Sequence, residues 1–310
     1  MILVTGGTGF IGRVLVRHLN EAGLPVRLLI RPTLHSPKLP PNIPVEIATS
    51  SLTDMRGLRS AMVDVEVVYH LASSERQGAR SDLLQTDIQG TQAISQAAAE
   101  AGVKRLFFLS HLGADRGSAY PVFKAKGIAE EHIRKSNLAY TIIRTAIIYG
   151  RNDHFTNGLV RLIRSFPYLF LPDDGAMLLQ PLWVEDLATC LVWALYNDDT
   201  SNQTYSIGGP EYLPLNQVAL TIMQAINLRR RIIHVYPPYL RGVTVIFETI
   251  FPGLPTSVYW LDYLATNRTC PLDTTTRVFN LIPGRLVHQL DYLQSHNQAT
   301  PFWRSLFQHK

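Results

Sequence analysis

Short apolar runs alternate with stretches of helical periodicity through the first half of the chain. The runs are continuously hydrophobic, which is typical of strands buried on both faces of a parallel sheet. The predicted strands are Ile2–Val4, Val26–Ile30, Val45–Ala48, Val65–Leu71, Arg105–Leu109 and Tyr140–Ile148. Helices are predicted between them, near 10–22, 55–62, 82–101 and 122–136. This order predicts an α/β fold with a Rossmann-type, doubly wound parallel sheet.

After Gly150 the alternation becomes less regular. Residues 184–196 still predict a helix, and Gln203–Ile207 predicts a further strand of the same sheet. Residues 151–180 and 210–310 have mixed periodicity and many prolines. We therefore expect one domain from residues 1–150 and 181–209, and a smaller, discontinuous region from the two remaining ranges. The smaller region would cover the carboxyl edge of the sheet, where a substrate or partner binds.

The first predicted strand leads directly into a glycine turn, Gly6-x-x-Gly9-x-x-Gly12, and apolar residues then recur at helical spacing. Strand, glycine turn and helix in this order are typical of a dinucleotide-binding βαβ unit. The glycines allow a tight turn and a close approach to a pyrophosphate, which binds at the helix N-terminus. A purely structural turn is the alternative. The expected cofactor contacts are Gly6, Thr8, Gly9, Phe10, Ile11 and Gly12.

The second predicted strand ends at Arg31. Sites for NAD commonly carry an acidic residue here, which accepts a hydrogen bond from the ribose 2′-hydroxyl. An arginine instead offers a charged fork to a 2′-phosphate. We therefore favour NADP(H) over NAD(H) as the cofactor. The alternative is that Arg31 is a solvated loop residue.

Composition narrows the choice of partners. The net charge of +5 fits an anionic cofactor or an acidic membrane surface, and the scattered basic residues do not form a nucleic-acid-binding motif. Two cysteines, Cys190 and Cys270, indicate neither a disulfide framework nor a metal site. The first strand begins at once, without a secretory signal, so we expect a cytoplasmic protein.

Residues 240–261 form the most apolar long stretch, but charged residues, glycine and prolines interrupt it, so it is not a standard transmembrane helix. Five apolar residues share one helical face: Leu240, Val243, Phe247, Ile250 and Phe251. Such a helix either packs on its own domain or lies on the cytoplasmic face of a membrane or on a partner subunit.

Further motifs follow the glycine turn in a fixed order. They are Val68-Tyr-His-Leu-Ala72, Phe108-Leu-Ser-His-Leu-Gly113, Lys126-Gly-Ile-Ala-Glu-Glu131 and Tyr140-Thr-Ile-Ile-Arg-Thr145. Together they resemble atypical short-chain dehydrogenase/reductase proteins of the NmrA-like and extended type. Three later segments bring the resemblance closer to the nucleotide-binding accessory subunits of respiratory complex I and their bacterial relatives: Tyr149–Phe155, Gln180–Asp186 and Tyr205–Tyr212.

Members of this superfamily that act as dehydrogenases use a serine, a tyrosine and a lysine. The resemblance assigns the serine to Ser110 and the lysine to Lys126, which would hold the nicotinamide ribose. The tyrosine position, four residues before the lysine, is occupied by Val122, which has no proton to give. Tyr120 and Lys124 have the same spacing, but this register turns the helix by about 200°, so Tyr120 is the weaker candidate for a catalytic acid.

Other expected cofactor contacts follow the resemblance. Ser51 stands where relatives often have an aspartate that reaches the adenine, and Thr145 replaces a common proline near the nicotinamide. His70 and His111 lie at strand ends, where we expect structural or cofactor-lining roles, because no carboxylate is near either of them in the sequence. The remaining expected contacts are Leu52, Leu71, Ala72 and Ser73.

Three functions remain open at this point. The absent tyrosine and the likeness to complex I subunits favour a non-catalytic or weakly catalytic NADP(H)-binding accessory subunit or assembly factor of a membrane-associated complex. The pair of Ser110 and Lys126 supports an NADP(H)-dependent reductase or isomerase of a small apolar carbonyl or quinone substrate. An NmrA-like redox sensor is the third possibility.

Overall fold

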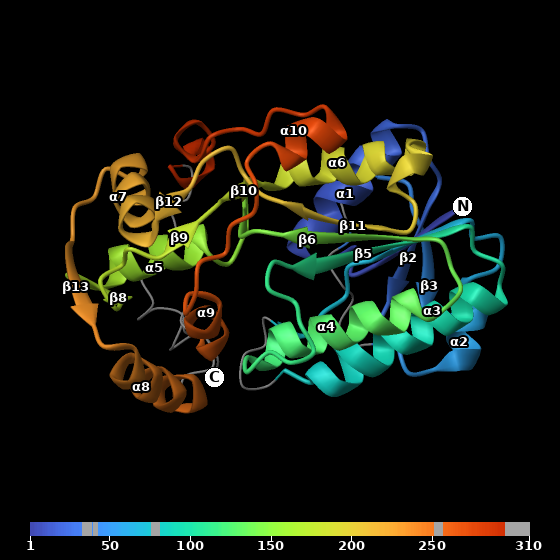
Figure 1. Cartoon of the computed structure of the whole chain (residues 1–310), viewed down its shortest axis with the longest axis horizontal. Coiled ribbons are helices and arrows are strands. Elements are labelled where there is room, and N and C mark those ends of the chain that lie inside the picture. The colour runs from blue at the N-terminus through green and yellow to red at the C-terminus, as the bar shows by residue number, and fades with distance from the viewer. Residues whose placement is uncertain (33–38, 40–42, 76–80, 251–256, 295–310) are drawn as a thin grey trace.

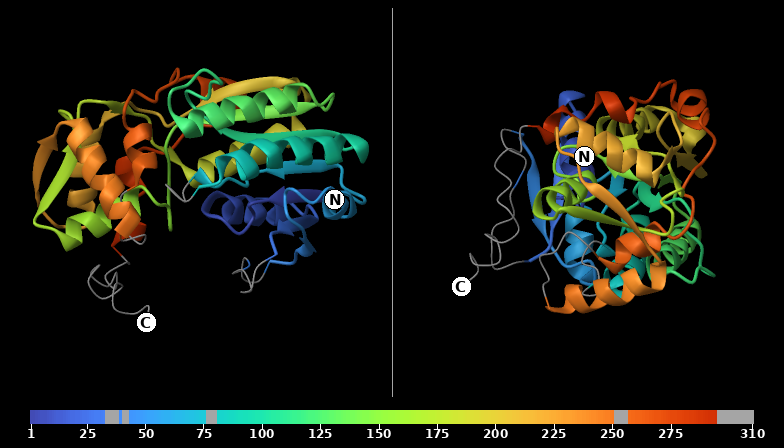
Figure 2. Two further views of the ribbon diagram at one scale, coloured as in Figure 1. Left: turned by 90° about the horizontal axis from the view of Figure 1, so that it is seen from below. Right: turned by 90° about the vertical axis from the view of Figure 1, so that its left-hand side faces the viewer.

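The computed structural model describes residues 1–32, 39, 43–75, 81–250 and 257–294. A larger part is built around one sheet, and a smaller part with α5, α7 and α8 lies beside it (Figures 1 and 2). The sheet has seven parallel strands in the order β11-β6-β5-β4-β1-β2-β3. Their bounds are β1 Ile2–Thr5, β2 Val26–Ile30, β3 Glu46–Thr49, β4 Val67–His70, β5 Arg105–His111, β6 Tyr140–Thr145 and β11 Gln203–Ile207. The predicted fold class is confirmed.

Helices cover both faces of this sheet (Figure 1). One face packs against α1 (Phe10–Glu21) and α6 (Val184–Tyr196), and the other against α2 (Met55–Ala61), α3 (Gly90–Glu100) and α4 (Pro121–Arg134). Adjacent residues of β1 point to opposite faces of the sheet. Val4 lies in the same apolar core as Leu15 of α1, whereas Leu3 lies in a second core with Leu58 of α2. Burial on both sides explains why the strands are continuously apolar in sequence.

Several predicted elements differ from the observed ones by one or two residues at their ends, and two differ in kind. The expected helix 82–101 consists of a π-helical segment, η2 (Leu83–Gln89), followed by α3. The expected strand Tyr140–Ile148 ends at Thr145, and a short strand β7 (Ile148–Tyr149) pairs instead with β10 (Leu182–Trp183). The apolar run therefore continues through a change of partner strand, which hydrophobicity alone does not reveal.

The smaller part has its own apolar core, which includes Leu169, Leu215, Val218 and Tyr263. Two pairs of short strands, β8 with β13 and β9 with β12, lie among helices. The bounds are α5 Thr156–Ser165, β8 Tyr168–Pro172, β9 Leu178–Leu179, β12 Leu213–Pro214, α7 Leu215–Ala225, β13 Arg231–Val235, α8 Pro237–Ile250, α9 Val258–Tyr263 and α10 Thr274–Phe279. Further short helical turns among the described residues are η3 Asp198–Thr200, η4 Leu286–His288 and η5 Asp291–Leu293.

The apolar stretch 240–261 falls on α8 and α9. Among the described residues, no helix has both the length and the apolar character needed to cross a membrane. Helix α8 leaves Val243 and Ile246 half exposed, while Thr244 is buried. The side chains of Phe247 and Ile250, and residue Phe251, lie outside the described residues.

Candidate functional site

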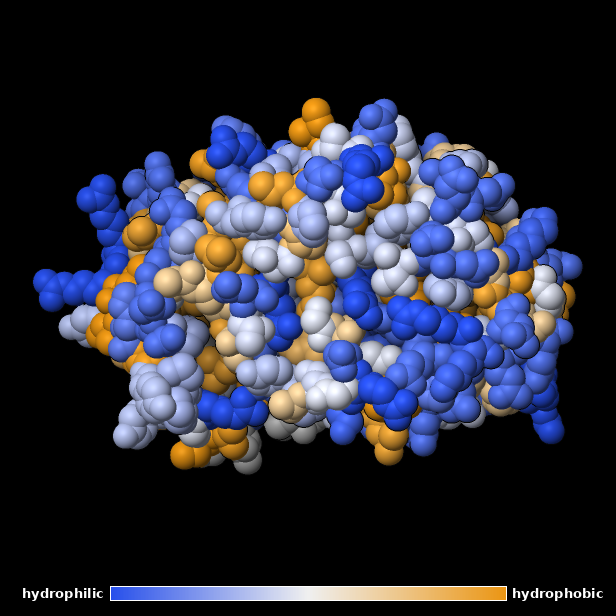
Figure 3. Space-filling model, viewed as in Figure 1, coloured by the Kyte–Doolittle hydropathy of each residue, from blue (hydrophilic) through white to orange (hydrophobic). Residues whose placement is uncertain are grey.

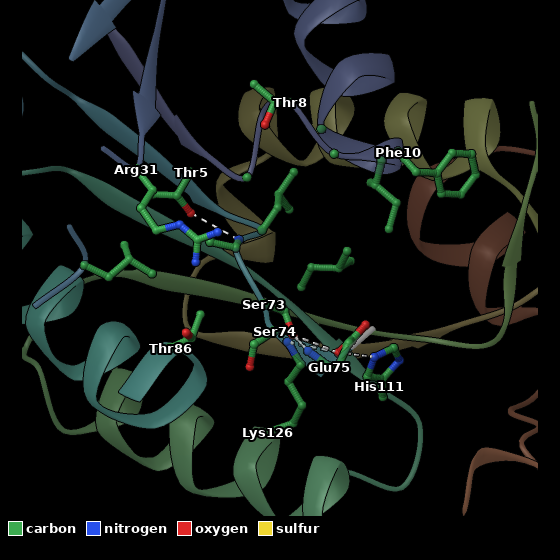
Figure 4. A pocket seen from close by; sticks show the side chains of 18 of the residues that line it. Thr5, Thr8, Phe10, Arg31, Ser73, Ser74, Glu75, Thr86, His111 and Lys126 are labelled. Carbon is green, nitrogen blue, oxygen red and sulfur yellow. Dashed lines mark hydrogen bonds and ion pairs between the residues drawn. The ribbon is translucent and has the colours of Figure 1, made fainter. Parts of the chain in front are cut away.

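A cavity of about 500 Å³ opens at the carboxyl edge of the sheet, where β1 lies between β4 and β2. The strand order reverses at this point, and doubly wound sheets bind ligands in such a crevice. Its lining comes from the first glycine turn, the end of β2, the segments after β3 and β4, the end of β5, and helices η2, α4 and α9. Figure 4 shows these side chains converging from several elements. We call this cavity the crevice.

The glycine turn brings backbone close to backbone at the start of α1. Gly6 has a φ of +70°, and a Cβ atom there would lie 2.8 Å from the backbone nitrogen of Ala72. A Cβ atom at Gly12 would lie 2.6 Å from Cα of Gly7. No side chain caps the N-terminus of α1 at Gly9. The helix end is therefore available to an anion, as a dinucleotide pyrophosphate requires.

Hydroxyl groups and one cation line the end of the crevice next to β2. Arg31 follows β2 directly and is exposed. Ser51, Leu52 and Thr53 lie in the same lining, after β3. An arginine with neighbouring hydroxyl groups suits the ribose end of an adenine nucleotide.

The opposite end of the crevice contains a buried cluster of charges (Figure 4). Nζ of Lys126 lies 3.3 Å from Oδ1 of Asp87 and 3.6 Å from Oε2 of Glu75. Asp87 also accepts hydrogen bonds from the Ser74 amide at 3.0 Å and the Ser74 hydroxyl at 2.8 Å. Burial opposes the charge on Lys126, but the two carboxylates outweigh this effect and raise the pKa of Lys126. The lysine is therefore a cation held inside the protein.

His111 lies beside this cluster, at the end of β5. Its Nε2 lies 2.9 Å from Oε2 of Glu75, which orients the ring, and its Nδ1 is buried without a hydrogen-bond partner. Tyr263 of α9 lines the same end of the crevice, with its ring centroid 6.0 Å from that of His111. The Tyr263 hydroxyl is likewise buried without a partner, and burial raises the pKa of this phenol. Two residues that line this end of the crevice thus each have a buried polar atom without a partner within the described chain.

His70, by contrast, is part of the scaffold. Its ring lies 2.7 Å from the Thr5 hydroxyl and 3.0 Å from the Thr91 hydroxyl, and it is fully buried. Burial, reinforced by the charge of Lys126, lowers the pKa of His70 to about 3. The neutral ring ties β1 to β4 through Thr5, whose hydroxyl also accepts a hydrogen bond from the Ala72 amide at 3.2 Å.

Three of the expected site residues do not line the crevice. The Ser110 hydroxyl donates to Oε1 of Glu130 at 2.7 Å, on the other face of the sheet, because neighbouring residues of a strand point in opposite directions. Thr145 is buried, and its hydroxyl donates to the Ser110 carbonyl at 3.3 Å. Tyr120 caps α4 and packs edge-on against Phe123, at 6.2 Å between ring centroids.

The remaining expected contacts do line the crevice: Gly6, Thr8, Gly9, Phe10, Ile11, Gly12, Arg31, Ser51, Leu52, Leu71, Ala72, Ser73 and Lys126. Val122 is buried in the core of the smaller part. It lies four residues before Lys126 on α4, at the position where dehydrogenases of the superfamily have the tyrosine, and Lys126 itself lines the cavity. The residues that sequence reasoning missed are Glu75, Asp87, Tyr259 and Tyr263, together with the pairing of His111. Glu75 lies 36 residues before His111 in the chain, so their contact has no local signal.

Comparison with known proteins defines the class. A family model described as NAD(P)H-binding matches residues 6–162, and the chain belongs to this family. Within it, the chain is an atypical or extended short-chain dehydrogenase/reductase protein of the NmrA-like type. A structure of UDP-glucose 4-epimerase from Thermus thermophilus in complex with NAD has the same fold, with a TM-score of 0.72 and 20% identity over 96% of this chain and 99% of the epimerase.

Two kinds of relatives are similar in sequence. Subunit 9 of the NADH dehydrogenase [ubiquinone] 1 alpha subcomplex, mitochondrial, from Arabidopsis thaliana is 24% identical over 99% of this chain and 80% of its own length. The rat counterpart is 29% identical, and the match spans 67% of this chain and only 56% of the rat protein. The NAD(P)H azoreductase of Xenophilus azovorans is 28% identical over 73% of both chains. The relatives thus include both a respiratory subunit and a reductase.

Proposed function

We propose that this protein is an NADP(H)-dependent reductase of a small apolar carbonyl or quinone compound, with a proton donor that differs from the usual tyrosine. The observation that carries the proposal is His111, whose ring lines the crevice and is held by Glu75 at 2.9 Å. Its other nitrogen, Nδ1, is buried without a hydrogen-bond partner. The azoreductase among the relatives supports an oxidoreductase activity.

The chain's own residues fit a dinucleotide. The glycine turn leaves no room for a side chain beside the pyrophosphate, and the uncapped start of α1 would bind its charge. Arg31 would bind the 2′-phosphate, and the Lys126 ammonium would donate to the nicotinamide ribose hydroxyls. When bound, NADPH supplies a hydride to the carbon of a substrate carbonyl.

The protein's task is then to protonate the carbonyl oxygen. A His111 ring protonated on both nitrogens would donate from Nε2 to Glu75 and could give the Nδ1 proton to the substrate once the ring turns toward it. The Nδ1–H bond would break as the O–H bond of the product alcohol forms, which would leave the ring neutral. The Tyr263 hydroxyl, kept protonated by burial, would donate a second hydrogen bond to the same oxygen.

Replacing Arg31 with aspartate is expected to reverse the cofactor preference. The loss of a charged hydrogen bond, together with repulsion of the 2′-phosphate, should weaken NADPH binding about 100-fold, whereas the aspartate can accept from the 2′-hydroxyl of NADH. Calorimetric titration of both coenzymes measures the ratio. Arg56→Asp is the matched control, because Arg56 is exposed on α2 outside the crevice. If Arg31→Asp weakened the binding of NADPH and NADH by the same factor, a contact between Arg31 and the 2′-phosphate would be contradicted.

Replacing His111 with glutamine should lower kcat for NADPH-dependent carbonyl reduction by about 100-fold, because the ring's proton is lost. NADPH affinity should change little. The loss should therefore fall on kcat and not on NADPH binding, a split that a merely structural role would not produce. His288→Gln is the control, because His288 is exposed in η4. A His111→Gln variant with wild-type kcat would rule out this residue as the acid.

An accessory subunit or assembly factor of a membrane-associated complex is the second candidate. Val122 at the tyrosine position and the likeness to the Arabidopsis respiratory subunit favour it. So does the apolar surface near β8 and β13, where Phe170, Ile233 and Val243 are at least one third exposed (Figure 3). Tight NADPH binding without turnover of any carbonyl or quinone compound would favour this role over the reductase.

A further inference from the structure

A second cavity, of about 310 Å³, lies in the smaller part between α5, β8, α8 and α9. Its lining is almost entirely apolar, with leucine and aromatic side chains on every side. Leu159, Leu169 and Leu215 are buried, whereas Tyr168 and Phe170 at the same cavity are 44% and 50% exposed. The cavity therefore has both a buried interior and a part next to solvent. We call it the apolar cavity.

Helix α9 separates the apolar cavity from the crevice. Tyr259 and Tyr263, four residues apart on one helix face, line the crevice. Leu261 and Leu264 line the apolar cavity, and Trp260 lines both. A molecule that passes Trp260 would thus have an apolar portion on one side of α9 and a polar portion on the other. His111 and Tyr263, each with a buried polar atom that lacks a partner, line the crevice on that side.

We propose that the apolar cavity binds the unbranched alkyl chain of the substrate, whose carbonyl group lies in the crevice against His111. This inference rests on the proposed reductase function and names its substrate class, an alkyl ketone or aldehyde with one chain. An engineered apolar cavity of about 150 Å³ takes one benzene ring, so about 310 Å³ has room for roughly twelve carbon atoms. A second chain or a large polar head would not fit in it.

The chemistry of the lining excludes other occupants. Few polar side chains, chiefly His154, Thr244 and Ser257, line the apolar cavity, so a sugar with several hydroxyl groups would not recover its hydration there. The lining is also a poor site for ordered water, which needs two to four polar partners. A hydrocarbon chain needs no hydrogen bonds and gains about fourfold in affinity with each buried methylene.

The test is calorimetric titration of the whole protein with methyl ketones of six to eighteen carbons. Affinity should rise about fourfold for each added methylene and level off at about fourteen carbons, because about twelve chain carbons fill the cavity and the carbonyl and methyl carbons lie in the crevice. Leu162→Trp places a large ring in the apolar cavity and should weaken the twelve-carbon ketone at least tenfold while leaving NADPH binding unchanged. Leu220→Trp is the matched control, because Leu220 is 49% exposed on α7 and outside the cavity.

The inference would be overturned if ketone affinity did not depend on chain length. It would also be overturned if Leu162→Trp and Leu220→Trp weakened binding of the twelve-carbon ketone equally. Leu162→Phe provides a smaller filling substitution if Leu162→Trp does not fold, and it should shorten the preferred chain by a few carbons. The NADPH titration keeps the two proposals apart. Ketone binding with a chain-length limit but no NADPH binding would leave the alkyl site intact and reject the reductase, whereas NADPH binding with a flat ketone series would reject only the alkyl site.

Discussion

Replacing Gly12 with valine is expected to abolish dinucleotide binding, with a loss of more than about 1000-fold in NADPH affinity. A Cβ atom at this position would lie 2.6 Å from Cα of Gly7, and this backbone atom cannot move aside as a flexible side chain could. The glycine turn would have to open, and the start of α1 would move away from the position that a pyrophosphate requires. Calorimetric titration with NADPH measures the loss.

Gly242→Ala provides the control for this substitution. Gly242 lies in α8, and a Cβ atom there would have no neighbour within 4 Å. Alanine should therefore leave NADPH affinity unchanged and stabilise the helix slightly. Circular dichroism and thermal unfolding without cofactor establish that Gly12→Val is folded; Gly12→Ala, with a smaller side chain, serves if it is not. A folded variant that binds NADPH within tenfold of wild type would show that the dinucleotide does not bind at this turn.

Much of the sheet could be predicted because each of its strands is buried on both faces. The prediction for residues 184–196 and 203–207 matches α6 and β11 at both ends, since strong helical periodicity and a short apolar run mark them. The prediction was wrong where an apolar run changed its partner strand, at Thr145. The π-helical turn in η2 was also missed, because local periodicity does not report one extra residue in a turn.

In the candidate site too, the residues that could be predicted are those whose position depends on local sequence. The glycine turn and Arg31 could be placed in the crevice because their geometry depends on neighbours in the sequence. The contacts of Glu75 with His111 and Lys126 depend on how separate elements pack, and no local pattern encodes them. Strand alternation puts Leu109 and His111 on one face of β5 and Ser110 on the other, so it supports the expected cofactor-lining role of His111 and could have excluded Ser110 from the crevice.

Replacing Lys126 with methionine is expected to lower the free energy of unfolding by about 3–5 kcal/mol. The variant would leave Glu75 and Asp87, which are 8% and 2% exposed, without the cation that lies between them. Methionine fills a similar volume, so the loss reports the unpaired charges rather than a cavity. Urea unfolding at pH 7 measures it. Lys124→Met is the control, because Lys124 is exposed on the same helix, and it should change stability by less than about 0.5 kcal/mol.

The pH dependence separates this charge effect from a packing effect. Because the pKa of Lys126 is raised in the folded protein, the cation's contribution is complete below the ordinary lysine value of about 10.4 and is lost as pH rises through the higher folded value. The difference between wild type and Lys126→Met should therefore stay constant from pH 7 to about pH 10 and shrink above it. A packing defect would give the same difference at every pH. A constant difference above pH 10 would thus show that Lys126 contributes through its stem and not through its charge.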